Sequence, residues 1–201
     1  MIRKDQAVRE PAVTTAAVAA MVRVWDPLVR VFHWTVVACC AANLLLETEA
    51  RVHKTIGYLV AAALTVRIAW GIVGRGHARF AAFVPRPAAL LAYLHAWLRR
   101  SEPRYLGHNP AGAIMIVTLL AVLFAVSVTG WMLGLDLFFG NQTLEYAHKG
   151  LALSLVPLVA VHVLAAIYEG MRHHENLIMA MVTGRKRAPG GSDVAHAPDA
   201  G

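Results

Sequence analysis

Residues 148–168 read HKGLALSLVPLVAVHVLAAIY, and this stretch decides the fold. From Leu151 onward, His162 is its only ionisable group apart from the terminal tyrosine. Its length is close to the ~20 residues with which a helix spans the hydrocarbon core of a bilayer. His148 and His162 are 14 residues apart, so a helix places them ~40° apart around its axis and ~21 Å apart along it. An ionisable side chain inside such a segment indicates a functional site.

Three other segments are similarly apolar. Residues 111–135 carry no charged residue, His33 is the only acidic or basic residue in 31–46, and Arg67 is the only charged one in 56–73. The whole chain is 58% hydrophobic and 15% charged, whereas soluble domains are about a quarter charged. We therefore predict an all-α integral membrane protein, an antiparallel four-helix transmembrane bundle. The predicted helices lie near residues 28–47, 54–74, 110–134 and 147–171.

Basic residues alternate between the connections of this bundle. The region before the first helix, the long connection between the second and third, and the region after the fourth are rich in arginine and lysine, and the other two connections are not. The positive-inside rule then predicts a multi-pass protein in membrane lipid, with both termini in the cytoplasm. This topology explains the net charge of +7, and no basic surface is interleaved with aromatic residues. We expect no nucleic-acid partner.

The rest of the chain suggests three further features. Residues 1–20 lack a strong apolar run before a cleavage site, so we expect a disordered cytoplasmic arm rather than a signal peptide. Residues 21–184 hold the four-helix domain, within which residues 87–100 place leucines and a tryptophan on one helical stripe. That stripe predicts a short interfacial helix between the second and third helices. Residues 185–201 include the low-complexity sequence APGGSDVAHAPDAG, and we expect a disordered cytoplasmic tail.

Topology assigns four histidines to two depths. His33 and His162 fall near the cytoplasmic side, and His53 and His148 fall near the external side. Each alone is more often an interfacial or loop-edge residue than a ligand, except His162, which lies deep in its helix. Together they predict two porphyrin sites, for which a hydrocarbon core of ~30 Å has room. Two imidazoles on one iron leave no open position for oxygen, which favours electron transfer.

Arginines offer partners for the propionates of such porphyrins. Arg67 lies 14 residues after His53, so it faces the bundle interior at the inner level. Its guanidinium suits a carboxylate, although snorkelling to the cytoplasmic headgroups is an equal alternative. Arg30 and Arg51 are weaker candidates of the same kind.

The sequence also limits other kinds of site. There is no C-x-x-C-H motif, so covalent haem attachment is excluded. Cys39 and Cys40 lie inside an apolar run, where packing is the expected role. His108 and His173 are the first substitutes if an inner ligand is wrong. A membrane carrier of zinc or copper remains an alternative, but no aspartate or glutamate falls inside the four apolar runs.

Five segments resemble the bacterial cytochrome b561 family, which is related to the b-type cytochrome subunit of nickel–iron hydrogenases. They read VRVWDPLVRVFHW, HKTIGYLVAAALTVRIAWGIVG, HARFAAFV, YLGHNPAGA and YEGMRHHENLIMAMVTGRKR. The resemblance covers roughly residues 21–187. It implies a four-helix protein of the bacterial inner membrane with two non-covalent b haems. It also implies ligation by His33, His53, His148 and His162, in the pairs that the topology predicts.

The resemblance implies a function as well. We expect a dihaem b-type cytochrome that relays electrons across the inner membrane between a periplasmic redox partner and the quinone pool. A c-type cytochrome or a dehydrogenase or hydrogenase subunit would be that partner. The alternatives are an enzyme of the same fold that oxidises superoxide or quinol, and the membrane-anchor cytochrome b subunit of a hydrogenase or dehydrogenase complex.

Overall fold

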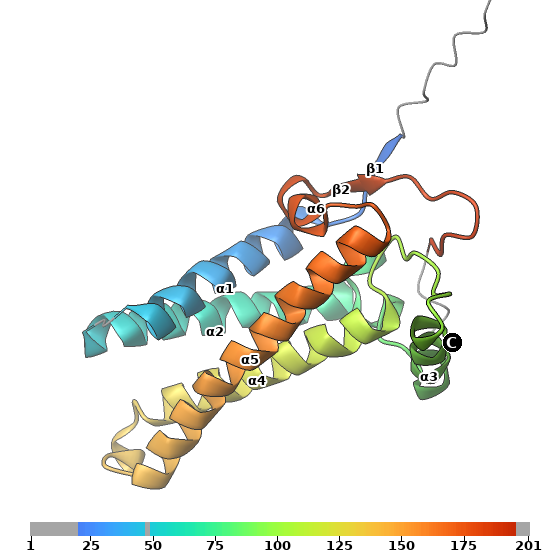
Figure 1. Cartoon of the computed structure of the whole chain (residues 1–201). Helices are drawn as coiled ribbons and strands as arrows, with labels where there is room; N and C mark the ends of the chain where they lie inside the picture. Colours follow the sequence, from blue (N-terminus) through green and yellow to red (C-terminus); the bar gives the residue numbers. More distant parts are fainter. Residues whose placement is uncertain (1–19, 47–48, 196–201) are drawn as a thin grey trace, which may run out of the picture.

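The computed structural model describes residues 20–46 and 49–195. The expected arm over residues 1–20 therefore lies, except for Ala20, outside the described residues. Four long helices dominate the fold (Figure 1): α1 (Pro27–Leu45), α2 (Ala50–Val73), α4 (Pro110–Met132) and α5 (Gln142–Arg172). Each is long and apolar enough to cross a membrane. The predicted helical membrane bundle is confirmed.

Side chains next to the helix starts explain where three of these helices begin. The Asp26 carboxylate accepts a hydrogen bond from the backbone N–H of Leu28, and the Asn109 side chain does the same for Gly112 at 2.7 Å. Asn141 caps α5 in this way through the N–H of Leu144. This cap starts α5 five residues before the predicted residue 147, so His148 lies in the second turn of the helix rather than in the first.

The helices pack in an open chain of neighbours. α1 packs on α2, α2 on α4, and α4 on α5, whereas α1 and α5 make little direct contact. The core lies where α2, α4 and α5 meet, and it contains Val60, Leu64, Leu123 and Leu155. Cys39 and Cys40 of α1 pack against this core, so the pair contributes to packing.

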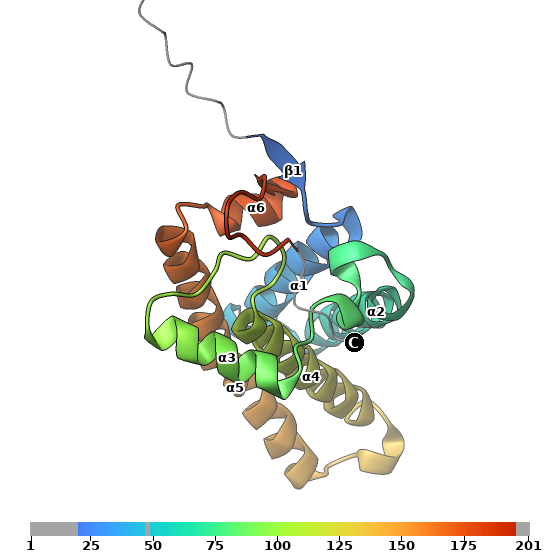
Figure 2. The same ribbon diagram turned by 90° about the vertical axis from the view of Figure 1, so that its right-hand side faces the viewer.

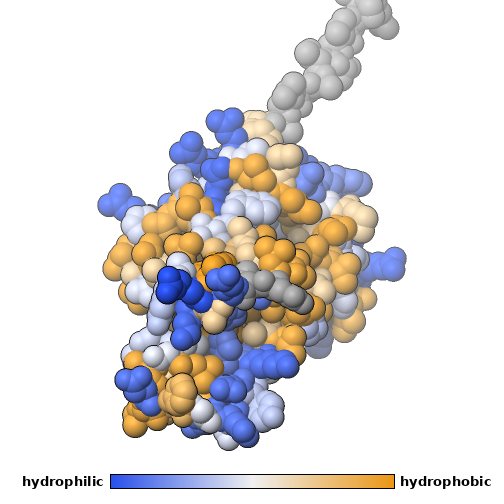
Figure 3. Space-filling model, turned by 90° about the vertical axis from the view of Figure 1, so that its left-hand side faces the viewer, coloured by the Kyte–Doolittle hydropathy of each residue, from blue (hydrophilic) through white to orange (hydrophobic). Residues whose placement is uncertain are grey.

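Much of the remaining surface is apolar, as expected of a bundle that meets lipid. Figure 3 views the end where α1 leads to α2 and α4 leads to α5, with apolar side chains among scattered hydrophilic ones. The 3₁₀ turn η3 (Asp136–Phe138) lies at this end. Phe139, which follows it, is 92% exposed.

The opposite end carries the short elements (Figure 2). The 3₁₀ turns η1 (Gly76–Ala78) and η2 (Phe80–Ala82) precede α3 (Pro87–Leu98), which occupies the position predicted for an interfacial helix. On the other side of this end lie α6 (Leu177–Thr183) and a ribbon in which β1 (Met21–Arg23) pairs antiparallel with β2 (Arg185–Arg187). Neither α6 nor the ribbon was predicted from the sequence.

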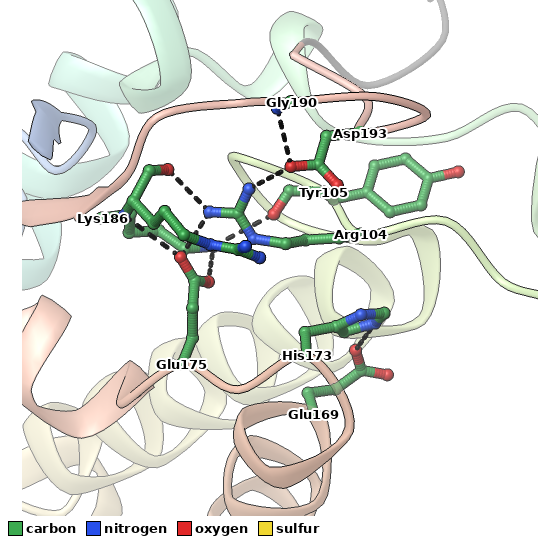
Figure 4. Close-up of polar contacts among 9 residues, drawn as sticks. Arg104, Tyr105, Glu169, His173, Glu175, Lys186, Gly190 and Asp193 are labelled. Carbon is green, nitrogen blue, oxygen red and sulfur yellow. Dashed lines mark hydrogen bonds and ion pairs between the residues drawn. The ribbon is translucent and has the colours of Figure 1, made fainter. Parts of the chain in front are cut away.

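Residues 196–201 of the expected disordered tail, which spans 185–201, lie outside the described residues. Residues 185–195 are ordered, because buried charges hold them to the bundle (Figure 4). The Arg104 guanidinium bridges Glu175 and Asp193 and donates to the Arg187 carbonyl oxygen. Lys186 pairs with Glu175 at 3.2 Å. Burial alone would raise the pKa of Glu175, but the hydrogen bond from Arg104 and the charge of Lys186 outweigh it and hold that pKa below its usual value.

Candidate cofactor site

The outer histidine pair, His53 and His148, comes from two helices, α2 and α5. His53 lies in the first turn of α2 and is exposed, and His148 lies near the start of α5 and is half-buried. Their ring centroids are 6.2 Å apart, with ring planes inclined at 79°. A metal ion held in trans by two imidazoles sets ring centres roughly 6 Å apart, because each metal–nitrogen bond is about 2 Å long. The spacing of this pair suits a single metal ion between the rings.

Helix α4 orients one ring of this pair. The Thr129 hydroxyl lies 3.0 Å from Nδ1 of His148 and 2.8 Å from the carbonyl oxygen of Ala125. A hydroxyl has one proton. When Thr129 donates that proton to Ala125, its oxygen accepts the N–H of Nδ1, which leaves Nε2 of His148 without a proton and free to bind a metal.

A glycine makes room for the same ring. A Cβ built on Gly130 would lie 3.0 Å from Cε1 of His148, which is tighter than ordinary van der Waals contact. The absence of a side chain at Gly130 thus lets the His148 ring lie against α4. In the sequence, the feature that could have indicated this contact is the pair Thr129-Gly130, which lies at the depth of His148.

The inner histidine pair lies on two helices that make little direct contact with each other. His33 on α1 and His162 on α5 are both half-buried and close enough to interact electrostatically. Nδ1 of His33 is buried and has no hydrogen-bond partner among residues 20–46 and 49–195. A buried, unpaired imidazole nitrogen is costly, and Nδ1 of His108 is in the same state, so this end of the bundle has two imidazole nitrogens without a hydrogen-bond partner in those ranges.

Arg67 is buried, with 3% of its surface exposed. Its guanidinium donates to the carbonyl oxygen of Ala78 at 3.3 Å and lies 5.0 Å from the centre of the Phe80 ring. The Phe80 ring fits there because Gly71 has no side chain: a Cβ on that residue would lie 2.2 Å from the ring. Snorkelling to the headgroups is thus not what this conformation shows. Within the described part of the chain, Arg67 forms no ion pair, so an anionic group beside it would be stabilised.

The weaker arginine candidates lie elsewhere. Arg30 turns toward α6, donates to the carbonyl oxygen of Val182, and keeps a buried Nε without a hydrogen-bond partner in the described ranges. Arg51 is exposed in the first turn of α2. Within residues 20–46 and 49–195, no hydrogen bond, ion pair or ring contact joins either side chain to a histidine.

The two substitute ligands have different surroundings. His108 lies between Trp25 and Phe83, with ring centroids 4.6 and 4.8 Å away, and burial lowers its pKa to about 3. Positive charge on Arg67 and on other nearby basic groups acts on the His108 pKa in the same direction. His173 instead pairs with Glu169 at 3.3 Å. The sequence alone did not indicate the aromatic surroundings of His108.

A multi-ligand metal centre is not found in the part of the chain that the structure describes, where no group of three or more histidine, cysteine or acidic side chains could hold an ion. The donors come instead as two pairs of imidazoles. Paired imidazoles without a third protein ligand are typical of a planar cofactor that supplies the metal's other donors.

Known proteins are similar to this chain over most of its length. A family model described as prokaryotic cytochrome b561 matches residues 24–184. A protein of Rhizobium leguminosarum bv. viciae, named as a probable Ni/Fe-hydrogenase B-type cytochrome subunit, is 27% identical, with 82% of this chain and 88% of the relative aligned. A protein of the same name from Azotobacter vinelandii is 31% identical, with 71% of this chain and 70% of the relative aligned.

Proposed function

This chain belongs to the prokaryotic cytochrome b561 family, and from that premise we propose that it relays electrons across the bacterial inner membrane through two b haems. Family membership makes it a membrane electron-transfer protein with b-type haem. The proposal adds the number of haems, their ligands and the direction of the relay. The observation that carries it is the 6.2 Å spacing between the rings of His53 and His148.

Each proposed haem lies between α5 and one helix of the α1–α2 pair. His53 and His148 hold the outer haem, and His33 and His162 hold the inner one. The donor set fits: both pairs are imidazoles, Gly130 leaves space beside His148, and Nδ1 of His33 lacks a partner in the described ranges. Bound haem iron supplies one-electron chemistry, and bis-histidine ligation keeps it from binding oxygen.

The surrounding residues orient and stabilise the cofactor. Thr129 sets the tautomer of His148 through Nδ1, and a hydrogen bond from that nitrogen raises the basicity of the ligating nitrogen. Arg67 holds a propionate of the inner haem, because its buried guanidinium lacks a carboxylate partner among the described residues. The apolar walls around both sites lower the dielectric, which strengthens that ion pair.

We infer the redox partners from the relatives and from the topology. The relatives are named as hydrogenase cytochrome subunits, so we propose that a hydrogenase-type subunit docks at the end of the bundle that carries η3. This end is periplasmic under the positive-inside rule. A membrane quinone then exchanges electrons with the inner haem, and both termini lie in the cytoplasm.

The pyridine haemochrome assay tests the cofactor proposal directly. We expect about two haems b per chain, since there are two histidine pairs, and one fewer in His53→Ala and in His162→Ala. His95→Ala is the matched control, because His95 is an exposed histidine of α3. One haem per chain in the unaltered protein, or equal haem content in all three variants, would refute the assignment.

A further inference from the structure

The ribbon of β1 and β2 presents arginines on its outer face. Arg23 lies directly opposite Arg185, and Met21 lies opposite Arg187. Alternate residues of a strand face opposite sides, so Lys186 points inward and is 5% exposed, while the three arginines share the exposed side. Three guanidinium groups therefore stand together on one small surface.

Negative charge offsets only part of this positive surface: Asp193 is close enough to Arg187 for the charge of that arginine to lower the Asp193 pKa. In residues 20–46 and 49–195, none of the three arginine side chains forms an ion pair or a hydrogen bond. The neighbouring carboxylates of Glu175 and Asp193 are already bound by Arg104 and Lys186. Like charges directly opposite each other in an antiparallel pair are destabilising. The ribbon would gain stability from an anion bound across its outer face.

The neighbouring surface is apolar. Helix α6 runs directly into β2, and its Ile178 and Val182 are about half exposed. Two side chains of α1 fix α6 at the end of the membrane-spanning segment: Arg30 donates to the carbonyl oxygen of Val182, and the Trp34 indole N–H donates to that of Met181. An apolar surface followed at once by arginines is typical of the boundary between acyl chains and headgroups.

We propose that Arg23, Arg185 and Arg187 form a binding site for the headgroups of anionic phospholipids in the leaflet next to α6. Guanidinium groups match phosphate geometry and bind it by charge-assisted hydrogen bonds. The exposed apolar residues of α6 would insert among the acyl chains beneath those headgroups. An acidic protein surface would satisfy the arginines but would leave α6 uncovered. The site does not depend on haem occupancy or on which leaflet faces the cytoplasm.

Native mass spectrometry of the detergent-purified full chain tests the site. The variant R23Q/R185Q/R187Q is compared with R75Q/R79Q/R99Q, which removes the same charge from exposed arginines at the same end of the bundle. We expect the unaltered protein and the control variant to bind at least about tenfold more phosphatidylglycerol than phosphatidylcholine. We expect the ribbon variant to lose this preference.

Three outcomes would overturn the proposal. The first is that the ribbon variant keeps its preference for phosphatidylglycerol. The second is that both variants lose this preference equally. The third is that soluble glycerophosphoglycerol displaces the lipid at equal concentration, because that result would indicate a phosphate site without a membrane role. Single substitutions such as R185Q replace the triple variant if it does not fold, because each removes one exposed charge and should reduce the preference in part.

Discussion

The Thr129 hydroxyl on α4 and Nδ1 of His148 on α5 are 3.0 Å apart, so one helix sets the orientation of a histidine carried by its neighbour. Thr129→Val keeps the shape and removes the hydrogen bond. We expect it to weaken outer-haem binding by about 10- to 100-fold, the usual effect of losing an outer-shell partner. Haem titration of the apoprotein measures this. Thr65→Val is the control, since Thr65 bonds only to its own helix, and an equal effect there would contradict the role of Thr129.

Gly130→Ala should disturb the same ring by contact rather than by hydrogen bonding. The new methyl group lies 3.0 Å from Cε1 of His148, so the imidazole must shift by a few tenths of an ångström. We expect a changed low-temperature absorption or electron paramagnetic resonance signal from one haem only. Gly57→Ala adds a methyl group where no atom lies within 4 Å and should leave both signals unchanged. Unchanged spectra in Gly130→Ala would argue against ligation by His148.

Arg67→Met separates cofactor binding from stability. Burying a charge that has no ion-pair partner costs free energy, and replacing it by an apolar side chain removes that cost. We therefore expect the apoprotein to keep or raise its unfolding temperature while the inner haem is lost or its midpoint potential changes. Redox titration with thermal unfolding of the apoprotein gives both readouts. Arg51→Gln, an exposed arginine of the same helix, is the control. Unchanged potentials and haem content would remove Arg67 from the site.

The buried charges around Glu175 predict how acid loosens the C-terminal segment. The pKa of Glu175 is lower in the folded protein than its usual 4.5. Its stabilisation is therefore complete above pH 4.5 and is lost as the pH falls through the folded pKa. Hydrogen-exchange protection of residues 185–195, corrected at each pH for the intrinsic exchange rate, should fall over that acidic range.

Glu175→Gln should release the segment already at neutral pH. It leaves Arg104 and Lys186 buried without their shared carboxylate, which costs about 3–5 kcal/mol when a buried pair is broken. Glu145→Gln, at an exposed residue of α5, should leave the exchange unchanged. If Glu175→Gln exchanges like the unaltered protein, the ion pairs do not hold the segment.

The long helices could be predicted because a segment that spans a lipid bilayer has to be apolar along its length. Runs such as residues 111–135 have to be apolar over the bilayer thickness, and the predicted bounds differ from the observed ones by a few residues except at the start of α5. That start depends on a single cap, Asn141. Composition alone does not show that the helix starts there.

The inner end could not be predicted in the same way. The segment after Arg187 has a low-complexity composition, yet Asp193 is held by Arg104, which lies 89 residues earlier in the chain. No local pattern reveals such a partner. The sequence likewise indicated His148 and His162 by their place in an apolar helix. The contact of Thr129 with His148 could not be predicted, because it depends on how α4 packs against α5.

The weak contact between α1 and α5 has a consequence for biogenesis. Three of the four neighbouring faces close through protein packing alone, and the fourth lies between His33 and His162. In the proposed cytochrome, metalloporphyrin insertion would therefore complete the tertiary structure after the hairpins have entered the bilayer. Chains made during iron starvation would remain half-assembled and become substrates for membrane quality-control proteases.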